Sequence, residues 1–275
     1  MTTTASTPTA PVADLAVIGG SGFYELLVDA ERHTVDTPYG APSDAITVSE
    51  IGGRRVAFLP RHGRGHALPP HRINYRANLW ALRALGVRQV LAPCAVGSLR
   101  PELGPGAVVV PDQLVDRTSG RVQTFYEEGA VHVSFADPYC PHGRAAVLEA
   151  AAETGAEATD GGTMVVIQGP RFSTRAESQW YAAAGWSLVN MTGHPEAVLA
   201  RELALCYTAV ALVTDLDAGI DADHSVSQEE VFAVFARNTV RLRGLVLAAL
   251  DRLPKERACG CPDALAGITL PFPLP

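Results

Sequence analysis

Short apolar segments rich in β-branched residues alternate with longer helical patterns along almost the whole chain. The apolar runs end in glycine, proline or polar residues and predict strands at residues 15–18, 55–59, 89–92, 107–110, 164–167 and 209–213. Apolar residues at helical spacing predict helices at residues 75–85, 144–154, 174–184, 195–205 and 228–250. Ser227 is a plausible N-cap of the last helix, because acidic residues follow it. This alternation implies one α/β domain with a mostly parallel or mixed sheet and flanking helices.

The length and composition allow such a domain to bury its own core. The chain has 275 residues, of which 47% are hydrophobic, so no metal or disulfide is needed to complete a core. No internal repeat or change of composition marks a linker between domains. We expect residues 1–12, which are small and polar, to form a disordered lead-in. Residues 13–253 are then the domain, and residues 254–275 a C-terminal tail.

Charge, hydropathy and cysteine count disfavour several classes of protein. The formal net charge of -7 argues against a nucleic-acid surface, which needs excess Lys and Arg. No stretch reaches the roughly 18 consecutive apolar residues of a membrane span. The N-terminal segment lacks the basic and apolar regions of a signal or transit peptide. Five cysteines do not suggest a secreted disulfide framework, so we expect a cytoplasmic protein without nucleic-acid or membrane partners.

Two segments that follow predicted strands are candidates for holding an anion, because ligands gather at the carboxyl ends of strands in such sheets. Gly19-Gly20-Ser21-Gly22 could offer free N–H groups and a hydroxyl. It lacks the dinucleotide fingerprint and the lysine of a P-loop, and a plain glycine turn is the alternative. Arg61 and His62 open a basic segment in which forked Arg donors suit phosphate oxygens and His adds donors near neutral pH. A solvated basic loop is the alternative there.

Small residues and a helix start supply two further candidates. Residues 92–99 follow a strand and would let backbone N–H groups reach a ligand, with tight helix–strand packing as the alternative. In the segment 190–196, Pro195 suits the first turn of a helix. The preceding N–H groups and the Thr192 hydroxyl could then attract an anion. Met191 could contact a sugar or simply fill the core.

An acidic pair follows the apolar run 209–213. If the chain stays extended there, Asp215 and Asp217 point to the same side of the sheet. Neighbouring carboxylates repel each other, which raises the pKa of at least one of them and keeps a proton available. A metal pair or a helix cap is the alternative, and no His or Cys spacing nearby would complete a metal site.

Taken in order, these segments resemble the methylthioadenosine phosphorylase branch of the purine nucleoside phosphorylase superfamily. The resemblance runs from about residue 15 to residue 250 and includes the stretches GAVVVPDQLVDRT (106–118), FADPYCP (135–141) and GTMVVIQGPRFSTRAE (162–177). It implies a single-domain, mixed-sheet α/β phosphorylase fold, usually a homotrimer with active sites near subunit boundaries. It also implies a glycosyltransferase of purine and methionine salvage that uses inorganic phosphate as co-substrate and needs no metal or organic cofactor.

Position by position, the resemblance assigns residues to the parts of a nucleoside site. Those implied to contact phosphate are Ser21, Arg61, His62, Cys94, Ala95 and Thr192. Those implied to contact the nucleoside are Met191 at the ribose, Phe172 beside the base, and Asp215 and Asp217 at the purine edge. Ser173 and Gln228 stand at positions that would influence specificity.

The chemistry of N-glycosidic cleavage is consistent with these assignments. The bond breaks through a cation-like sugar, so an enzyme needs an anion beneath C1′ and a proton donor at the base. Phosphate, held by Arg61, His62 and backbone N–H groups, would be the anion and the nucleophile. Asp215, if protonated, could donate to N7 of the departing purine. The resemblance implies Asn at this position in the 6-oxopurine branch, so Asp215 favours adenine-type bases and 5′-methylthioadenosine as the main substrate.

Several alternatives stay open at the level of sequence. Gln228 stands where the family usually places an apolar residue against the methylthio group, so adenosine or 5′-deoxyadenosine could also be used. The nearest rivals keep the fold: a 6-oxopurine or broad-specificity nucleoside phosphorylase, or a nucleosidase that uses water. A non-catalytic nucleoside-binding protein is the alternative from another class. In the tail, Cys259 and Cys261 alone lack the four ligands of a structural zinc site, and we expect two free surface thiols.

Overall fold

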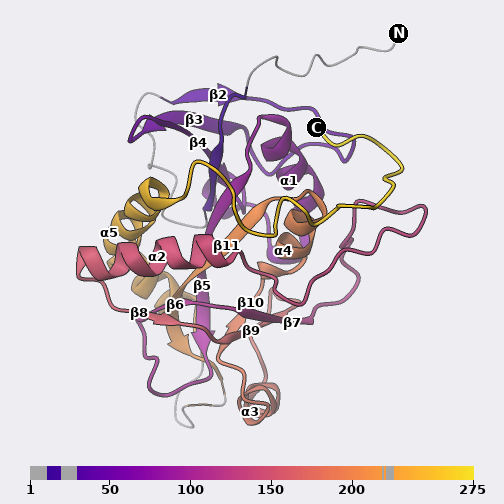
Figure 1. The fold of residues 1–275 in the computed structure, drawn as a ribbon. Coiled ribbons are helices and arrows are strands. Elements are labelled where there is room, and N and C mark those ends of the chain that lie inside the picture. The colour runs from indigo at the N-terminus through magenta and orange to yellow at the C-terminus, as the bar shows by residue number, and fades with distance from the viewer. Residues whose placement is uncertain (1–10, 20–29, 219, 221–225) are drawn as a thin grey trace.

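The computed structural model describes residues 11–19, 30–218, 220 and 226–275, within which eleven strands form one mixed sheet flanked by helices (Figure 1). The strands are β1 (Leu15–Gly19), β2 (Glu31–His33), β3 (Ile46–Ile51), β4 (Arg54–Pro60), β5 (Gln89–Ser98), β6 (Val108–Val110), β7 (Gln113–Arg117), β8 (Ala158–Asp160), β9 (Thr163–Ile167), β10 (Leu188–Asn190) and β11 (Cys206–Leu216). The α-helices are α1 (Tyr75–Ala84), α2 (Pro141–Thr154), α3 (Arg175–Ala183), α4 (Gly193–Glu202) and α5 (Gln228–Arg252). Two 3-10 turns, η1 (Arg64–His66) and η2 (Pro70–Arg72), follow β4. The expected α/β class with a mixed sheet is confirmed.

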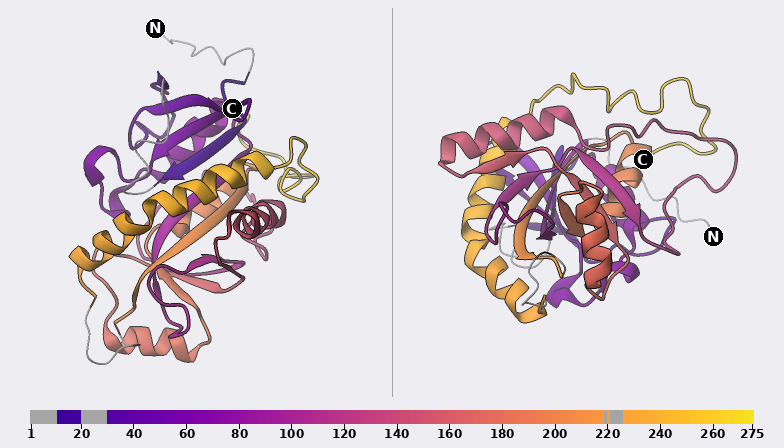
Figure 2. Two further views of the ribbon diagram at one scale, coloured as in Figure 1. Left: turned by 90° about the vertical axis from the view of Figure 1, so that its left-hand side faces the viewer. Right: turned by 90° about the horizontal axis from the view of Figure 1, so that it is seen from below.

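The central strands are buried on both faces, which explains their unbroken apolar sequences. In β1, Leu15 and Val17 belong to the core under α2 and α5, whereas Ala16 and Ile18 belong to the core under α1 and α4. Successive side chains of a strand point to opposite faces, so one short strand contributes to both cores. Figure 2 shows α5 lying along one side of the sheet, next to α2.

The sheet opens beside β5, and this opening positions the site. One edge of β5 pairs with β11 along its whole length. The other edge pairs with β1 only as far as Leu91, and with β10 only at Gly97 and Ser98. Pro93 lies in the interval between these pairings, where its missing N–H breaks no ladder bond. A gap between β1 and β10 therefore exposes the backbone of β5.

Each predicted strand and helix is present, with ends shifted by a few residues, but three expectations need correction. Residues 92–98 do not follow a strand; they continue β5. The helix expected from Pro195 begins at Gly193, with His194 in a non-helical conformation. Five short strands, β2, β3, β7, β8 and β10, were not predicted. The N-cap role of Ser227 is confirmed, since its side chain accepts from the N–H of Glu230.

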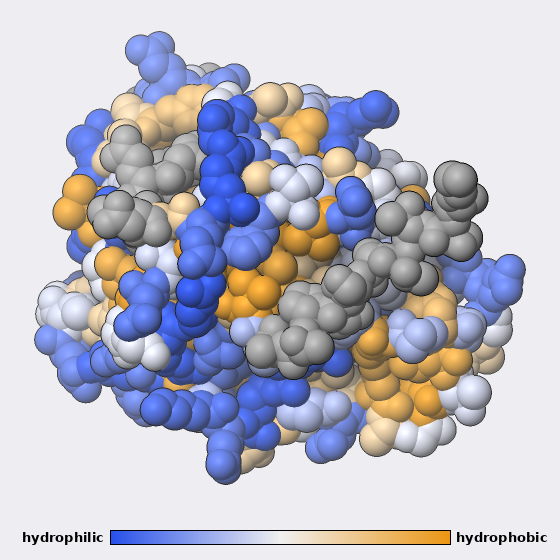
Figure 3. Space-filling model, turned by 90° about the horizontal axis from the view of Figure 1, so that it is seen from above, coloured by the Kyte–Doolittle hydropathy of each residue, from blue (hydrophilic) through white to orange (hydrophobic). Residues whose placement is uncertain are grey.

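The ends of the chain lie against the domain where they are described. Of the expected lead-in, residues 1–10 lie outside the described residues, and the N–H of Val12 donates to the carbonyl of Leu85. In the tail, Leu270, Phe272 and Leu274 pack on the core, and the ring of Phe272 stacks on Tyr126 with centroids 5.3 Å apart. The surface seen from above is largely hydrophilic with separate apolar patches (Figure 3). Among the described helices, none has the length and apolar character needed to cross a membrane.

Candidate active site

A cavity of about 360 Å³ lies at the opening of the sheet. That volume suits a ligand the size of a nucleoside with an anion. The residues predicted to contact phosphate or nucleoside that line it are Arg61, His62, Cys94, Ala95, Phe172, Met191, Thr192, Asp215, Asp217 and Gln228. Ser21 lies outside the described residues, and Ser173 is buried but is not part of the lining. Segments from six parts of the chain thus meet around one space.

Arg61, which directly follows β4, is held rigidly at one end of this cavity. Its guanidinium makes a bidentate ion pair with Glu196, with Nε 2.8 Å from Oε2 and Nη2 2.9 Å from Oε1. Further N–H groups donate to the carbonyls of Ile18 (3.0 Å) and Pro93 (3.1 Å). Burial by itself lowers the pKa of Arg61, but the Glu196 carboxylate outweighs it and the pKa is raised. The cation is therefore permanent, and one of its five N–H groups stays available for a ligand.

His62 is held differently from what the sequence suggested. Its Nδ1 lies 2.8 Å from the carbonyl of Leu68, which can only accept, so Nδ1 carries the proton of the neutral ring. Burial, with smaller effects of His66 and Arg61, lowers the pKa of His62 to about 3. The ring of His66 stacks on it with centroids 4.0 Å apart. At neutral pH the only N–H of the His62 ring therefore donates to the backbone. Its Nε2 is an acceptor, whereas the sequence led us to expect a donor.

The exposed backbone of β5 completes this end of the cavity. The side chain of Asn190 donates to the carbonyl of Ala95 at 3.1 Å, so Ala95 directs its carbonyl into the gap beside β5. In a strand, the N–H and C=O of one residue point the same way, and the N–H of Ala95 therefore faces the gap as well. The Cys94 side chain is buried, and burial raises the pKa of its thiol to about 12. Cys94 is consequently a neutral contact.

The start of α4 differs from the sequence interpretation. The N–H groups of Thr192 and Gly193 do not face open space; they donate to Oδ1 of Asn190 at 2.8 and 2.6 Å. What Thr192 offers the cavity is its hydroxyl, whose nearest acceptor is the same oxygen at 3.5 Å. Thr192 can therefore donate its O–H to an anion. The N–H groups of Thr192 and Gly193 cannot, because both are bound to Asn190.

Asp215 and Asp217 lie together at the other end, as the extended strand predicted. A Cβ built on Gly97 would be 2.9 Å from Oδ1 of Asp215 and 3.4 Å from the Cβ of Asp217, so both side chains lie over this glycine. Burial raises the pKa of Asp215 to about 6, against a hydrogen bond of 2.7 Å from Thr214. The charges of Asp217 and Glu230 contribute less. Burial, more than the expected repulsion, therefore keeps a proton available.

Asp217 is also buried and only partly satisfied. Burial raises its pKa, while the hydroxyls of Ser173 and Ser178 and the N–H of Ala218 act against this rise. Within the described part of the chain, its Oδ2 has no hydrogen-bond partner of normal geometry, and the same holds for the Ser173 hydroxyl. A ligand that donates a hydrogen bond would satisfy this oxygen. Ser173 thus acts on Asp217 from behind the lining.

The wall of the cavity formed by Met191, Phe172 and the start of α5 is mostly apolar. Met191 and Phe172 line it, and Gly169, with φ of 60°, lets the chain pass close to Met191, since a Cβ there would be 2.7 Å from Sδ. At the mouth, Gln228 at the start of α5 stands beside Val231 and Phe232. Gln228 is therefore one polar group on an otherwise apolar wall.

Sequence reasoning missed the residues that hold the site from outside. Glu196 was named only as part of the helix start, yet it is fully buried and accepts from Arg61 and from the hydroxyl of Tyr207 (2.7 Å). Arg121 donates to the carbonyls of Met191 (2.9 Å) and Gln168 (2.7 Å) and so fixes two lining segments. An acidic residue inside an apolar helix pattern is a signal that could have identified Glu196.

Comparisons with known proteins agree with this geometry. The sequence model of the phosphorylase superfamily matches residues 14–251. A relative from Mycobacterium tuberculosis, named S-methyl-5′-thioadenosine phosphorylase, is 63% identical over 95% of this chain and 97% of its own. One from Streptomyces coelicolor, named purine nucleoside phosphorylase, is 61% identical over 96% and 98%. A crystal structure of a methylthioadenosine phosphorylase from an antarctic soil metagenome has a TM-score of 0.87 at 40% identity, covering 94% of this chain and 92% of that one.

The chain therefore belongs to the phosphorylase superfamily. Within it, the chain falls in the methylthioadenosine and purine nucleoside phosphorylase branch, as the resemblance implied.

Proposed function

We propose that this protein cleaves the N-glycosidic bond of 5′-methylthioadenosine with inorganic phosphate, releasing adenine and 5-methylthioribose 1-phosphate. One observation carries the proposal. A single cavity is lined both by a permanent cation with neighbouring donors, at Arg61, Thr192 and Ala95, and by a carboxyl of raised pKa, at Asp215. The name of the Mycobacterium tuberculosis relative supports the same substrate.

Phosphate would bind at the Arg61 end. The remaining N–H of the guanidinium, the N–H of Ala95 and the Thr192 hydroxyl would donate to its oxygens, while the permanent charge of Arg61 attracts the anion. The neutral His62 would accept from the protonated oxygen of HPO4²⁻ at Nε2, because its Nδ1 proton is bound to Leu68. Ser21 remains a predicted contact. These groups would place one phosphate oxygen beneath C1′ of the sugar.

The purine would bind at the acidic end. Asp215, protonated in a large share of molecules near its pKa of about 6, would donate to N7 and let the base leave as a neutral molecule. The unpartnered Oδ2 of Asp217 would accept from the exocyclic 6-amino group of adenine. A 6-oxopurine offers a carbonyl in that place, which two carboxyls satisfy less well. Phe172 would pack on the base and Met191 on the ribose.

The 5′ substituent would face Val231 and Phe232 at the mouth of the cavity. An apolar wall favours a methylthio group over a hydroxyl through burial of apolar surface. The Gln228 amide would still allow adenosine as a slower substrate.

A kinetic panel tests this proposal. Purified protein is given methylthioadenosine, adenosine, 5′-deoxyadenosine or inosine, with and without phosphate, and base release is followed by chromatography. We expect adenine and a sugar 1-phosphate from methylthioadenosine only when phosphate is present. Inosine as the preferred substrate would establish a 6-oxopurine phosphorylase instead, and release without phosphate would establish a nucleosidase. If the protein bound these nucleosides but converted none of them, it would be a non-catalytic nucleoside-binding protein.

We propose further that the enzyme is a cytoplasmic homotrimer of purine and methionine salvage and that phosphate is its only co-reactant. The resemblance to a family of homotrimers supports this oligomeric state. Five free cysteines support a reducing compartment. Light scattering should give three times the mass of one chain, and activity should survive a chelator that removes loosely bound metals.

A further inference from the structure

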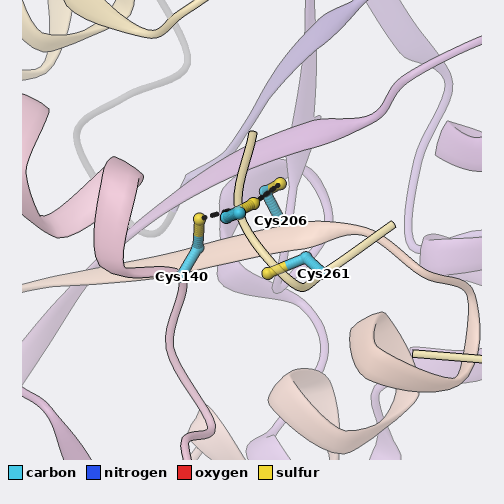
Figure 4. Close-up of side chains that lie close together, drawn as sticks. Cys140, Cys206 and Cys261 are labelled. Atoms are coloured by element: carbon cyan, nitrogen blue, oxygen red, sulfur yellow. Dashed lines mark hydrogen bonds between the residues drawn. The ribbon is translucent and has the colours of Figure 1, made fainter. Parts of the chain in front are cut away.

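Four of the five cysteines come together at a place distant from the cavity. Cys140 directly precedes α2, Cys206 begins β11, and Cys259 and Cys261 come from the tail. Figure 4 shows the labelled side chains of Cys140, Cys206 and Cys261 lying close together. Three of the four are buried and Cys259 is partly so. Both tail thiols are free, as expected, but they are not on the surface, because the fold packs them against Cys140 and Cys206.

The spacing of the sulfur atoms suits a metal ion rather than a disulfide. All four Sγ atoms lie within 4.8 Å of one another, with Cys140 3.7 Å and Cys206 3.4 Å from Cys259. A disulfide needs a separation of about 2 Å. A tetrahedral zinc ion with Zn–S bonds of about 2.3 Å places its sulfur ligands about 3.8 Å apart. The separations of 3.4 and 3.7 Å lie just below that value, and no pair of the four Sγ atoms is more than 4.8 Å apart.

We propose that Cys140, Cys206, Cys259 and Cys261 bind one Zn²⁺ ion as a closed structural site. Four thiolates complete the tetrahedral coordination of zinc and leave no open position for substrate. Binding displaces the thiol protons, four if all the thiols start protonated, and involves no change of oxidation state.

The surroundings of the cluster suit the negative charge of a zinc ion with four thiolates. Cys140 is the N-cap residue of α2, so the positive end of this fourteen-residue helix lies beside its sulfur. One arginine side chain lies near the start of β11: the guanidinium of Arg257 donates to the carbonyl of Ala204, two residues before Cys206. Buried metal–thiolate charge is stabilised by such cations and backbone dipoles.

The site would fasten the tail to the domain without taking part in the reaction. It joins the tail to the starts of α2 and β11, and none of its cysteines lines the cavity. Asp215 lies nine residues along β11 from Cys206, a distance of about 30 Å in an extended strand. The aromatic contact of Phe272 with Tyr126 holds the same tail further along. Zinc would thus stabilise the fold. It would affect catalysis only indirectly, by keeping the protein folded.

Metal content tests the proposal. The untagged full-length protein, expressed with zinc in the medium and purified under reducing conditions, should carry about one Zn²⁺ per chain by mass spectrometry of the elements. Cys261→Ser and Cys259→Ser should reduce this content by about tenfold or more, in line with the loss of a structural ligand. Cys94→Ser is the matched control, because it removes the buried cysteine outside the cluster, and it should keep the full zinc content.

A second measurement covers variants that fail to fold. Zinc-free wild-type protein, reduced and kept without oxygen, should bind one equivalent of Co²⁺ and develop the thiolate charge-transfer and tetrahedral d–d bands of a cobalt–sulfur site. Wild-type protein that carries only trace metal and gives no such bands would overturn the proposal. So would a native mass lower by four hydrogens, which would mean two disulfides, or a zinc content unchanged in Cys261→Ser.

Discussion

The two ends of the cavity bury ionisable groups in opposite ways. At the anion end, Arg61 is fully enclosed and stays charged because Glu196 pairs with it, and Glu196 in turn accepts a hydrogen bond from Tyr207. At the base end, Asp215 and Asp217 are buried, and among the described residues hydroxyls and a backbone N–H, rather than a cation, oppose the cost of their charge. Because a counter-charge stabilises the buried cation, the first end keeps a fixed charge. Because no counter-charge stabilises the buried carboxylates, their pKa is raised and the second end can supply a proton.

This difference assigns different work to the two ends. A fixed charge serves binding, because it holds an anion in place without changing its own state. A carboxyl with a pKa of about 6 serves proton transfer, because both of its states are accessible near neutral pH. The predictions that follow change the charges at one end at a time, and the last one changes the apolar wall beside Gln228.

Asp215→Asn should have the largest effect. It leaves the shape of the base end unchanged but removes the acidic proton, so kcat/KM for methylthioadenosine should fall by about 10²–10⁴-fold. Because an amide can donate to O6, the ratio of inosine to methylthioadenosine activity should rise. Asp217→Asn is the matched variant and should cost less. Equal losses in the two variants, or an unchanged base preference in Asp215→Asn, would remove Asp215 from its role.

Glu196→Gln removes the compensation at the anion end. Arg61 would then be a buried cation with no counter-charge, and we expect a loss of about 3–5 kcal/mol in the free energy of unfolding. The KM for phosphate should rise in whatever folded protein remains. Tyr207→Phe, which removes a single hydrogen bond to Glu196, should cost about 1 kcal/mol. Urea unfolding of the two variants measures both free energies. A similarly small loss of stability in each would contradict the claim that Glu196 stabilises the charge of Arg61.

The buried carboxyl of Asp215 should lower the free energy of unfolding by an amount that depends on pH. The native pKa of Asp215 is raised from 3.8 to about 6, so the native state binds the proton more tightly than the unfolded state. Unfolding free energy therefore falls as pH rises from 4 to 6, and the penalty, at most about 3 kcal/mol, is complete above 6. Asp215→Asn should be more stable than wild type by up to this amount at pH 8.

That gain should disappear below a pH of about 4, where wild type is neutral in both states. The exposed Asp137 provides the control, since Asp137→Asn should change stability little at any pH. A gain for Asp215→Asn that is the same at pH 4 and pH 8 would mean that packing, not ionisation, is responsible.

Gln228→Leu should have the smallest effect. It completes the apolar wall with Val231 and Phe232, so preference for methylthioadenosine over adenosine should rise by about tenfold, the size expected for a small apolar difference in a pocket. The ratio of the two kcat/KM values measures it. No change in this ratio would place the 5′ substituent elsewhere.

Local patterns predicted most of the fold, because buried strands and helix starts depend mainly on residues that are neighbours in the sequence. β1 and α5 are examples, with an unbroken apolar run in one and the Ser227 cap in the other. The short strands β2 and β8 were missed because three residues carry too little pattern and depend on the strand beside them. The extension of β5 through Pro93 was missed for a similar reason, since it depends on the gap between β1 and β10.

Most of the predicted site residues line one cavity, but the sequence did not predict their protonation and hydrogen bonding. Residue type predicted that at least one carboxylate of the pair Asp215 and Asp217 would have a raised pKa, but the main cause for Asp215, burial rather than its neighbour, is a property of packing. The bond from His62 to the Leu68 carbonyl and the ion pair of Arg61 with Glu196 join residues that local spacing does not connect. The cysteine cluster required contact between residues 119 positions apart.

The pH dependence of catalysis tests most directly the claim that uncompensated burial makes Asp215 the proton donor. The kcat/KM of wild type for methylthioadenosine at saturating phosphate is divided by that of Asp215→Asn at each pH, which cancels the titration of phosphate itself. This ratio should be level below a pH of about 6 and fall by about tenfold per unit above it. A ratio that stays constant from pH 5 to pH 9 would contradict the account.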